Sequence, residues 1–166
     1  LNCYYMLIMQ LDAIVLKPDL LVNWVAADYD YVGAPEAGHY SYDISNLPPF
    51  NKLNKSLGPI KLQGLNGGLS MRKPGKIISI LEEYPELVNF FREYAGGVGE
   101  DIYFSLMSKI SALDFKMPNE ILASKFAYTS NFEEWLDFNR GDMPFGLHAW
   151  YRNPKDRQFV INFLKA

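Results

Sequence analysis

An acidic residue directly follows an apolar run near the start of the chain. The run Tyr4-Tyr5-Met6-Leu7-Ile8-Met9 ends in Gln10-Leu11-Asp12, and a strand covered by helices on both faces is apolar throughout. The carboxyl end of such a strand opens into the crevice where α/β proteins bind ligands. Asp12 is therefore a candidate metal ligand. The alternative is that Asp12 caps a turn ahead of Pro18, because aspartate often hydrogen-bonds nearby backbone.

Two adjacent carboxylates form a second candidate group. Glu100 and Asp101 follow Gly99 at the start of a predicted helix, where the helix dipole favours negative charge. One acid can hold a substrate hydroxyl while the other removes its proton. Capping of the helix is the alternative role of this pair.

A glycine pair lies in the segment Asn66-Gly67-Gly68-Leu69-Ser70. Glycine permits a positive φ or a close approach of the backbone to a ligand, which suits a sugar or a phosphate. A tight turn or a bulge leading into a strand is the alternative. Arg72, just beyond, has the geometry for a bidentate contact with phosphate, or it is a solvated surface arginine.

His148 lies in the charge-poor segment Pro144-Phe145-Gly146-Leu147-His148-Ala149-Trp150. A neutral imidazole there can complete a metal site or bind phosphate, and a packed core histidine is the alternative. His39, in a Tyr-rich loop, is a weaker candidate. The two histidines have no close metal-ligand spacing, which argues against a structural zinc site.

Strands and helices must position these residues, and the apolar spacing predicts both. The expected elements are a strand over 4–9, a helix from Pro18 that ends before Asp28, a strand over 31–34, helices over 77–84 and 100–110, a short strand over 114–117, a brief helix from Asn119 to about Phe126 and a final helix capped by Asn153. Between Glu36 and Gly64 the chain is rich in Gly, Pro, Asn, Ser and Tyr, which predicts a long irregular loop, a candidate acceptor lid.

Composition limits the class of protein. The chain has 166 residues, 49% of them hydrophobic, which is enough for one sizeable core in a single domain over 1–166. The net charge is −3 and its basic residues are scattered, so nucleic acid is not expected as a partner. No apolar stretch approaches the ~18 residues of a membrane span. Cys3, in the apolar opening strand, is expected to be a buried thiol, which fits a reducing, cytoplasmic location. Because the chain starts almost within a core strand, we expect a fragment that lacks its amino-terminal portion.

The order of five segments resembles a domain-of-unknown-function family, whose uncharacterised members are regarded as candidate glycosyltransferases with a GT-A-like fold. The segments are Gln10-Leu11-Asp12, Asp30-Tyr31-Val32-Gly33-Ala34-Pro35, Asn66-Gly67-Gly68-Leu69-Ser70-Met71-Arg72, Gly99-Glu100-Asp101-Ile102 and Pro144-Phe145-Gly146-Leu147-His148-Ala149-Trp150. The resemblance implies an α/β, GT-A-like mixed sheet flanked by helices, here without its amino-terminal βα units.

The resemblance also implies a function. It is that of a hexosyltransferase of polysaccharide biosynthesis, which transfers a sugar from a nucleotide-sugar donor to a hydroxyl of a glycan or other acceptor, with inversion. Asp12 matches the acid that binds the donor diphosphate through Mn²⁺ or Mg²⁺, and Gln10 stands where the usual pattern has another acid. His148 looks like a late metal or phosphate ligand, and Asp101 or Glu100 looks like the base.

The remaining candidates concern substrate binding. Asn66, Gly67 and Gly68 resemble a wall of the sugar site, and Trp150 can offer a flat face to a sugar ring. Glu36 departs from the aromatic residue expected after Ala34-Pro35. A non-catalytic carbohydrate-binding domain of the same fold, suggested by Gln10, is the alternative function, and a metal-dependent hydrolase is a third. Placement of Asp12, Asp101 and His148 around one cleft is what the transferase requires.

Overall fold

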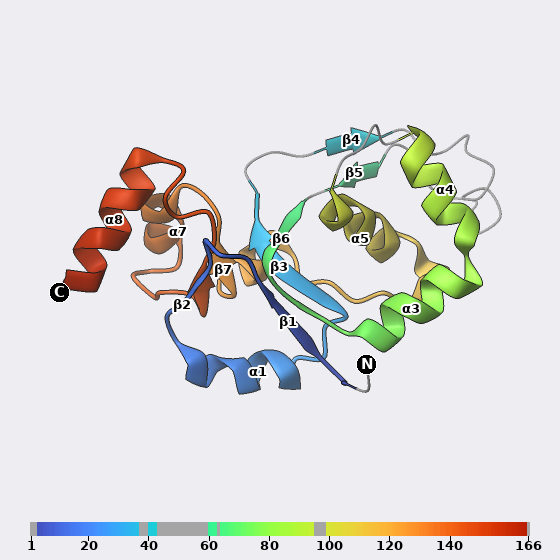
Figure 1. Ribbon diagram of the computed structural model, residues 1–166, viewed down its shortest axis with the longest axis horizontal. Helices are drawn as coiled ribbons and strands as arrows, with labels where there is room; N and C mark the ends of the chain where they lie inside the picture. Colours follow the sequence, from blue (N-terminus) through green and yellow to red (C-terminus); the bar gives the residue numbers. More distant parts are fainter. Residues whose placement is uncertain (1–2, 37–39, 43–59, 63, 95–98, 166) are drawn as a thin grey trace.

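The computed structural model describes residues 3–36, 40–42, 60–62, 64–94 and 99–165. It is a mixed α/β structure with three small sheets (Figure 1). The central sheet has the order β1-β6-β3, in which β6 (Leu65–Arg72) pairs antiparallel with both β1 (Met6–Met9) and β3 (Tyr31–Pro35). β6 is therefore the middle strand of this sheet, and both β1 and β3 hydrogen-bond to it.

Two smaller sheets flank the central one. In the first, β8 (Gly146–Leu147) pairs antiparallel with β2 (Ile14–Val15) and parallel with β7 (Ala127–Tyr128). In the second, β4 (Tyr40–Tyr42) pairs antiparallel with β5 (Ile60–Leu62). In the β2-β8-β7 sheet, the pairing of β8 with β2 places the segment around His148 close to the end of β1. The polar motifs from the start and from the end of the sequence therefore lie together.

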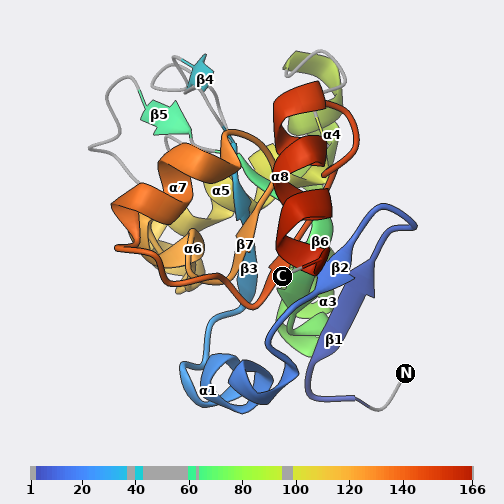
Figure 2. The ribbon, with the colours of Figure 1, turned by 90° about the vertical axis from the view of Figure 1, so that its left-hand side faces the viewer.

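Helices lie on either side of the central sheet. Figure 1 shows α3, α4 and α5 grouped at one end of the molecule and α7 and α8 at the other, and Figure 2 is viewed from the end that carries α7 and α8. The helices are α1 (Leu21–Ala26), α3 (Pro74–Glu83), α4 (Pro85–Tyr94), α5 (Glu100–Lys109), α6 (Glu120–Ala123), α7 (Phe132–Phe138) and α8 (Pro154–Lys165), with 3₁₀ turns η1 (Pro18–Leu20) and η2 (Ser111–Leu113). None of the helices in these described ranges is both long and apolar enough to cross a bilayer.

The two faces of the central sheet bury different cores. Tyr31 and Leu65 pack into a cluster with the inner faces of α3, α4 and α5. Val32 and Leu69 pack on the other face with Trp24 and with residues around β7 and β8. A third cluster lies between α7 and α8. Burial on both faces fixes β3 and β6, so the residues they carry are held rigidly.

Some expectations for the opening segment are wrong. β1 lies at the edge of the described sheet, its residues are half-buried, and Met9 is exposed. The strand is therefore not covered by helices on both faces. Cys3 is exposed rather than buried, because it precedes β1 and packs into none of the core clusters.

Several predicted boundaries also need correction. Residues 114–117 form no strand: Asp114 is left-handed with φ +43. The Lys116 carbonyl accepts from the Asp30 and Tyr31 N–H groups, but its own N–H donates to the Asp30 carboxylate and not to a strand backbone. The helix capped by Asn119 ends at Ala123, short of Phe126. The segment expected to be an irregular loop contains β4 and β5, and residues 37–39, 43–59 and 63 lie outside the described residues.

Candidate functional site

The glycine pair lies within β6, opposite an irregularity in the pairing with β3. The register passes from Gly33 opposite Ser70 to Ala34 opposite Asn66, so β6 bulges at this point. The Asn66 side chain accepts a hydrogen bond from the Gly68 N–H at 2.9 Å and thereby holds the bulge. Of the two alternatives considered for the glycine pair, a bulge in a strand describes its local structure.

Gly68 makes room for His148. A Cβ built on Gly68 would lie 2.0 Å from Nε2 of His148 and within 2.5 Å of two ring carbons, so the imidazole rests directly on the strand backbone. Only glycine fits there. The His148 side chain is 2% exposed, and Ala149, the next residue, adopts a left-handed φ of +54. Such strained residues concentrate where the surrounding structure enforces a geometry.

The buried imidazole collects polar partners from distant parts of the chain. His148 Nε2 lies 3.0 Å from Gln10 Oε1 and 3.2 Å from Asp12 Oδ1. Its Nδ1 lies 3.2 Å from the Thr129 hydroxyl. The backbone N–H of Gln10 donates to the Gly68 carbonyl at 2.8 Å, which ties the end of β1 to the same glycine. We call Gln10, Asp12 and His148 the imidazole cluster.

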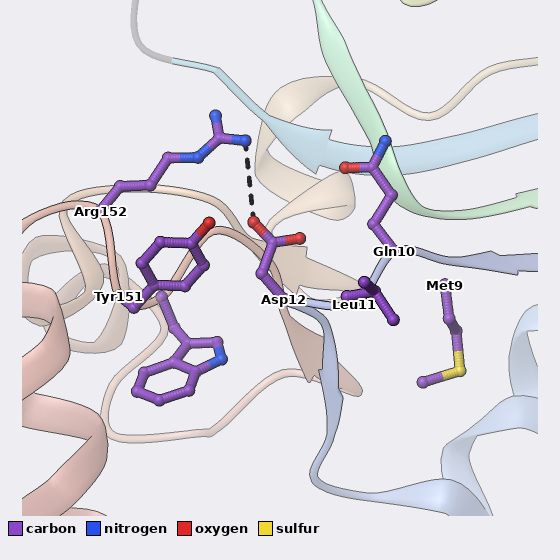
Figure 3. A pocket seen from close by; sticks show the side chains of 7 residues that line it. Met9, Gln10, Leu11, Asp12, Tyr151 and Arg152 are labelled. Carbon is purple, nitrogen blue, oxygen red and sulfur yellow. Dashed lines mark ion pairs between the residues drawn. The ribbon is translucent and has the colours of Figure 1, made fainter.

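Burial lowers the pKa of His148, and this effect outweighs the opposite influence of the Asp12 carboxylate. The imidazole is therefore neutral at neutral pH, and a neutral ring nitrogen has a lone pair for a metal ion. Asp12 also faces Arg152, whose Nη2 is 3.7 Å from Asp12 Oδ2 (Figure 3). The Arg152 side chain is 63% exposed, so it can turn toward a bound anion.

Gly67 makes room for a second polar group. A Cβ on Gly67 would lie 2.7 Å from Arg72 Nη2 and 2.7 Å from Glu100 Oε1, and these two atoms form an ion pair of 2.9 Å. Partial burial acts to raise the pKa of Glu100, but the hydrogen bond from Arg72, a hydrogen bond from the Glu100 backbone N–H and the charge of Arg72 together keep this pKa below its ordinary value. Glu100 is thus an ionised carboxylate.

Asp101 has the opposite electrostatics. It lies in the first turn of α5 beside Glu100, one position after the helix begins. Burial raises its pKa, and the charge of Glu36 raises it further. Glu36 is itself oriented by the Asn66 side chain, which donates to its Oε1 at 2.7 Å. A carboxylate with a raised pKa is a better proton acceptor than an ordinary aspartate.

These groups line two adjoining cavities that share Gln10 and Arg152. The first has a volume of about 390 Å³ and is lined by Gln10, Glu36, Asn66, Gly67, Gly68, Gly99, Glu100, Asp101, Ile102, His148 and Arg152. The second, of about 540 Å³, is lined by Met9, Gln10, Leu11, Asp12, Trp150, Tyr151 and Arg152 (Figure 3). Asp12 and Trp150 line the second cavity, and the other residues to which the family resemblance gives a catalytic, substrate-binding or metal-binding role line the first. Arg72 lines neither cavity, and His39 lies outside the described residues.

We call the two adjoining cavities together the cleft. Two charged residues that line it were not predicted from the sequence to be functional. The sequence marks Glu36 only as a departure from an expected aromatic residue, and Arg152 is not among the residues predicted from it. Arg152 lies four residues after His148, so its position beside a candidate ligand was an available signal. The side chain of Arg72, by contrast, is only 13% exposed, so the alternative of a solvated surface arginine is wrong.

The imidazole cluster fits a divalent cation in donor type and spacing. Two ligands about 2.1 Å from a metal, on neighbouring corners of an octahedron, are about 3 Å apart. The distances from His148 Nε2 to Gln10 Oε1 and to Asp12 Oδ1, 3.0 and 3.2 Å, match that separation and are equally those of hydrogen bonds from an Nε2–H to two acceptor oxygens, so a cation would take the place of that proton. Within the described ranges, no three His, Cys, Asp or Glu side chains gather to hold a metal. A cation here would depend on the Gln10 amide and on ligands from a substrate.

A family model described as "Protein of unknown function (DUF5672)" matches residues 1–148, which is most of the chain. The match ends at His148, so it spans β1, the glycine pair and the Glu100-Asp101 pair but excludes Arg152 and α8. No curated protein and no solved structure matches the chain.

Proposed function

This chain belongs to the DUF5672 family, and we propose that it is a GT-A-like glycosyltransferase that moves a sugar from a nucleotide-sugar donor to an acceptor hydroxyl with inversion. The observation that carries the proposal is the arrangement around the glycine pair. Gln10 and His148 of the imidazole cluster, suited to a cation, line the same cavity as Asp101, suited to accept a proton, and Asp12 contacts His148 from the adjoining cavity. A transfer reaction needs one group at the leaving diphosphate and another at the attacking hydroxyl.

We assign the donor to the cavity that contains Asp12, Trp150 and Arg152. Mn²⁺ or Mg²⁺ held by Asp12, His148 and the Gln10 amide would offset the negative charge that grows on the leaving diphosphate. Arg152 lines both cavities, and its exposed guanidinium, paired with Asp12 at 3.7 Å, is suited to a phosphate oxygen. The side chains of Trp150 and Tyr151 supply apolar surface for the planar base or the sugar.

We assign the acceptor to the cavity that contains Asp101 and Glu36. The acceptor oxygen forms a bond to the anomeric carbon while the bond from that carbon to the diphosphate oxygen breaks, and the electron pair of that bond leaves with the diphosphate. The hydroxyl proton passes to Asp101. The raised pKa of Asp101 increases its affinity for that proton, and attack opposite to the leaving group inverts the anomeric centre.

The second candidate is a non-catalytic carbohydrate-binding domain of the same fold. It is favoured by the presence of an amide, Gln10, where an acid would give a stronger cation site. In that case the cleft binds sugars through Glu36, Asn66 and Glu100 without any need for a cation.

Calorimetric titration with UDP and with GDP, each with and without Mn²⁺, tests the proposal. We expect binding of one nucleotide that depends on Mn²⁺ and is lost in Asp12→Asn, which keeps the shape of the side chain but removes its charge. Asp19→Asn is the matched control, because Asp19 is an exposed aspartate in η1. Nucleotide binding that survives Asp12→Asn would exclude Asp12 as the metal ligand, and sugar binding without any nucleotide binding would favour the second candidate.

A further inference from the structure

Arg72 is a half-buried cation near the cavity that contains Glu100, and the proposed transfer chemistry does not use it directly. It is the last residue of β6, and its side chain is 13% exposed. Its guanidinium carbon lies 5.5 Å from the centre of the Tyr31 ring and 5.3 Å from that of Phe104. Contacts with two aromatic rings restrict the plane of the guanidinium and favour the charged group.

Hydrogen bonds fix the same guanidinium from the edge. Nε donates to the Ser70 hydroxyl at 3.0 Å, and Nη2 lies 3.4 Å from the Gly67 carbonyl oxygen. The Ser70 hydroxyl donates in turn to that same carbonyl at 2.9 Å. Nη2 is thereby directed at Glu100 Oε1, 2.9 Å away. The Glu100 side chain, by contrast, is 58% exposed and lines the cavity, where a ligand can reach its carboxylate.

We propose that Arg72 is a positioning residue, which holds the Glu100 carboxylate ionised and fixed at the cleft wall so that it accepts a hydrogen bond from the acceptor while Asp101 takes the proton. This inference rests on the proposed function, and it decides between the two acids that the sequence left as equivalent candidates. The opposite shifts in the pKa values of Glu100 and Asp101 agree with this division of roles.

The charges around the two acids support the same assignment. Glu100 faces Arg72 from β6, and this cation favours its ionised form. Asp101 faces Glu36, just after β3, and Glu100 on its own helix, and both raise its pKa. His148 and Arg152 line the same cavity, and His148 is neutral because of its burial.

Carbon-13 NMR titration of the labelled Glu and Asp side-chain carboxyl groups tests the proposal without any substrate. Glu100→Gln and Asp101→Asn assign the two resonances. We expect the pKa of Glu100 to rise in Arg72→Met, because the cation that opposes the effect of burial is then gone, and that of Asp101 to stay above its ordinary value. Arg92→Met is the matched control, since Arg92 is exposed on α4 and its loss changes the net charge equally.

Gly67→Ala provides a variant that keeps every charge. Its Cβ would meet only the flexible ends of Arg72 and Glu100 at less than 3 Å, so we expect the fold to persist while the ion pair separates. The pKa of Glu100 should rise in this variant as well. An unchanged Glu100 pKa in both Arg72→Met and Gly67→Ala would overturn the proposal, whether or not the protein transfers sugar.

The second readout is release of UDP from UDP-glucose and of GDP from GDP-mannose across a range of pH, in the presence of Mn²⁺. In Arg72→Met and Gly67→Ala we expect kcat/KM to fall by about 10- to 100-fold, the size of effect that a displacement of about 1 Å can produce. A raised Glu100 pKa with no turnover by the wild type would refute the transferase while supporting the charge assignment. Normal turnover in both variants would overturn the positioning role.

Discussion

Replacing Gly68 by alanine is the sharpest test of how the imidazole cluster is built. A Cβ at this position would lie 2.0 Å from His148 Nε2, whereas ordinary contacts begin at 3.4 Å. The buried ring must therefore move by roughly 1 Å or more, which disrupts the 3.0 Å contact with Gln10 and the 3.2 Å contact with Asp12. Overpacking of this kind destabilises a protein by about 1–3 kcal/mol.

The sign of the effect depends on His148 alone, which permits a double-mutant cycle. Alanine in a strand is otherwise favoured over glycine by about 0.5–1 kcal/mol, because glycine loses more conformational freedom on folding. Gly68→Ala should therefore be destabilising in the wild type and neutral or stabilising in the His148→Ala background. The expected coupling energy is about 2 kcal/mol, within the range seen for residues in contact.

Urea denaturation followed by tryptophan fluorescence gives the four free energies of unfolding. Gly75→Ala is the matched control, because a Cβ there meets nothing within 4 Å and alanine is the better helix former in α3. Gly75→Ala should thus raise the free energy of unfolding. If Gly68→Ala has the same effect in the presence and absence of the His148 imidazole, the ring does not rest on β6 and the geometry of the cluster is wrong.

Three further predictions concern protonation and burial. If Asp101 is the base, the acid limb of the kcat/KM profile lies above the ordinary aspartate pKa of 3.8. Glu36→Gln should move that limb to lower pH, because the Glu36 charge that raises the pKa of Asp101 is gone. An unmoved limb would exclude this coupling between Glu36 and Asp101. Because the pKa of His148 is lower in the folded protein than in the unfolded chain, the unfolded chain binds the proton first on acidification. The wild type should therefore lose stability, relative to His148→Gln, as the pH falls below 6.5, measured by urea denaturation at a series of pH values. Asp156 is 5% exposed and accepts the Phe132 N–H at 3.0 Å, so Asp156→Ala should destabilise the protein by about 1–3 kcal/mol, whereas the same change at the exposed Asp19 should have little effect.

Where local chemistry decides the structure, the sequence was sufficient to predict it. Asn119 caps α6, with its side chain accepting the Leu122 N–H at 2.9 Å. Pro154 occupies the first turn of α8, and Gly99 precedes α5. Each of these residues acts on backbone groups within one turn of itself, so no information about distant parts of the chain is required.

Where tertiary packing decides the structure, the prediction from the sequence was wrong. Phe115 and Met117 alternate with polar residues, which predicted a strand at 114–117. In the structure Phe115 instead stacks on Phe104, with ring centres 6.0 Å apart, and buries its side chain without a strand partner. The left-handed Asp114 then turns the chain away from any ladder. Ring packing thus buries the apolar residues whose alternation with polar residues predicted a strand.

The site itself combines both cases. Its residue types were visible in the sequence, but Gln10 and His148 are 138 positions apart, and their contact depends on the short β2-β8-β7 sheet, which was not predicted. Two-residue strands such as β2 and β8 carry too little periodicity to be recognised. Glu36 acquires its importance only through the Asn66 side chain and the nearby Asp101, which are contacts across the sheet.

The glycine pair explains why one strand can support two kinds of chemistry. The Arg72–Glu100 pair takes the place of the missing side chain of Gly67, and the His148 ring takes the place of that of Gly68. Glycines inside a strand usually weaken it, but here each admits a polar group against the backbone. It follows that Gly67→Ala should alter the carboxyl pKa values and spare cation binding, whereas Gly68→Ala should do the reverse. An equal effect of both substitutions on both properties would mean that the two groups form one cluster.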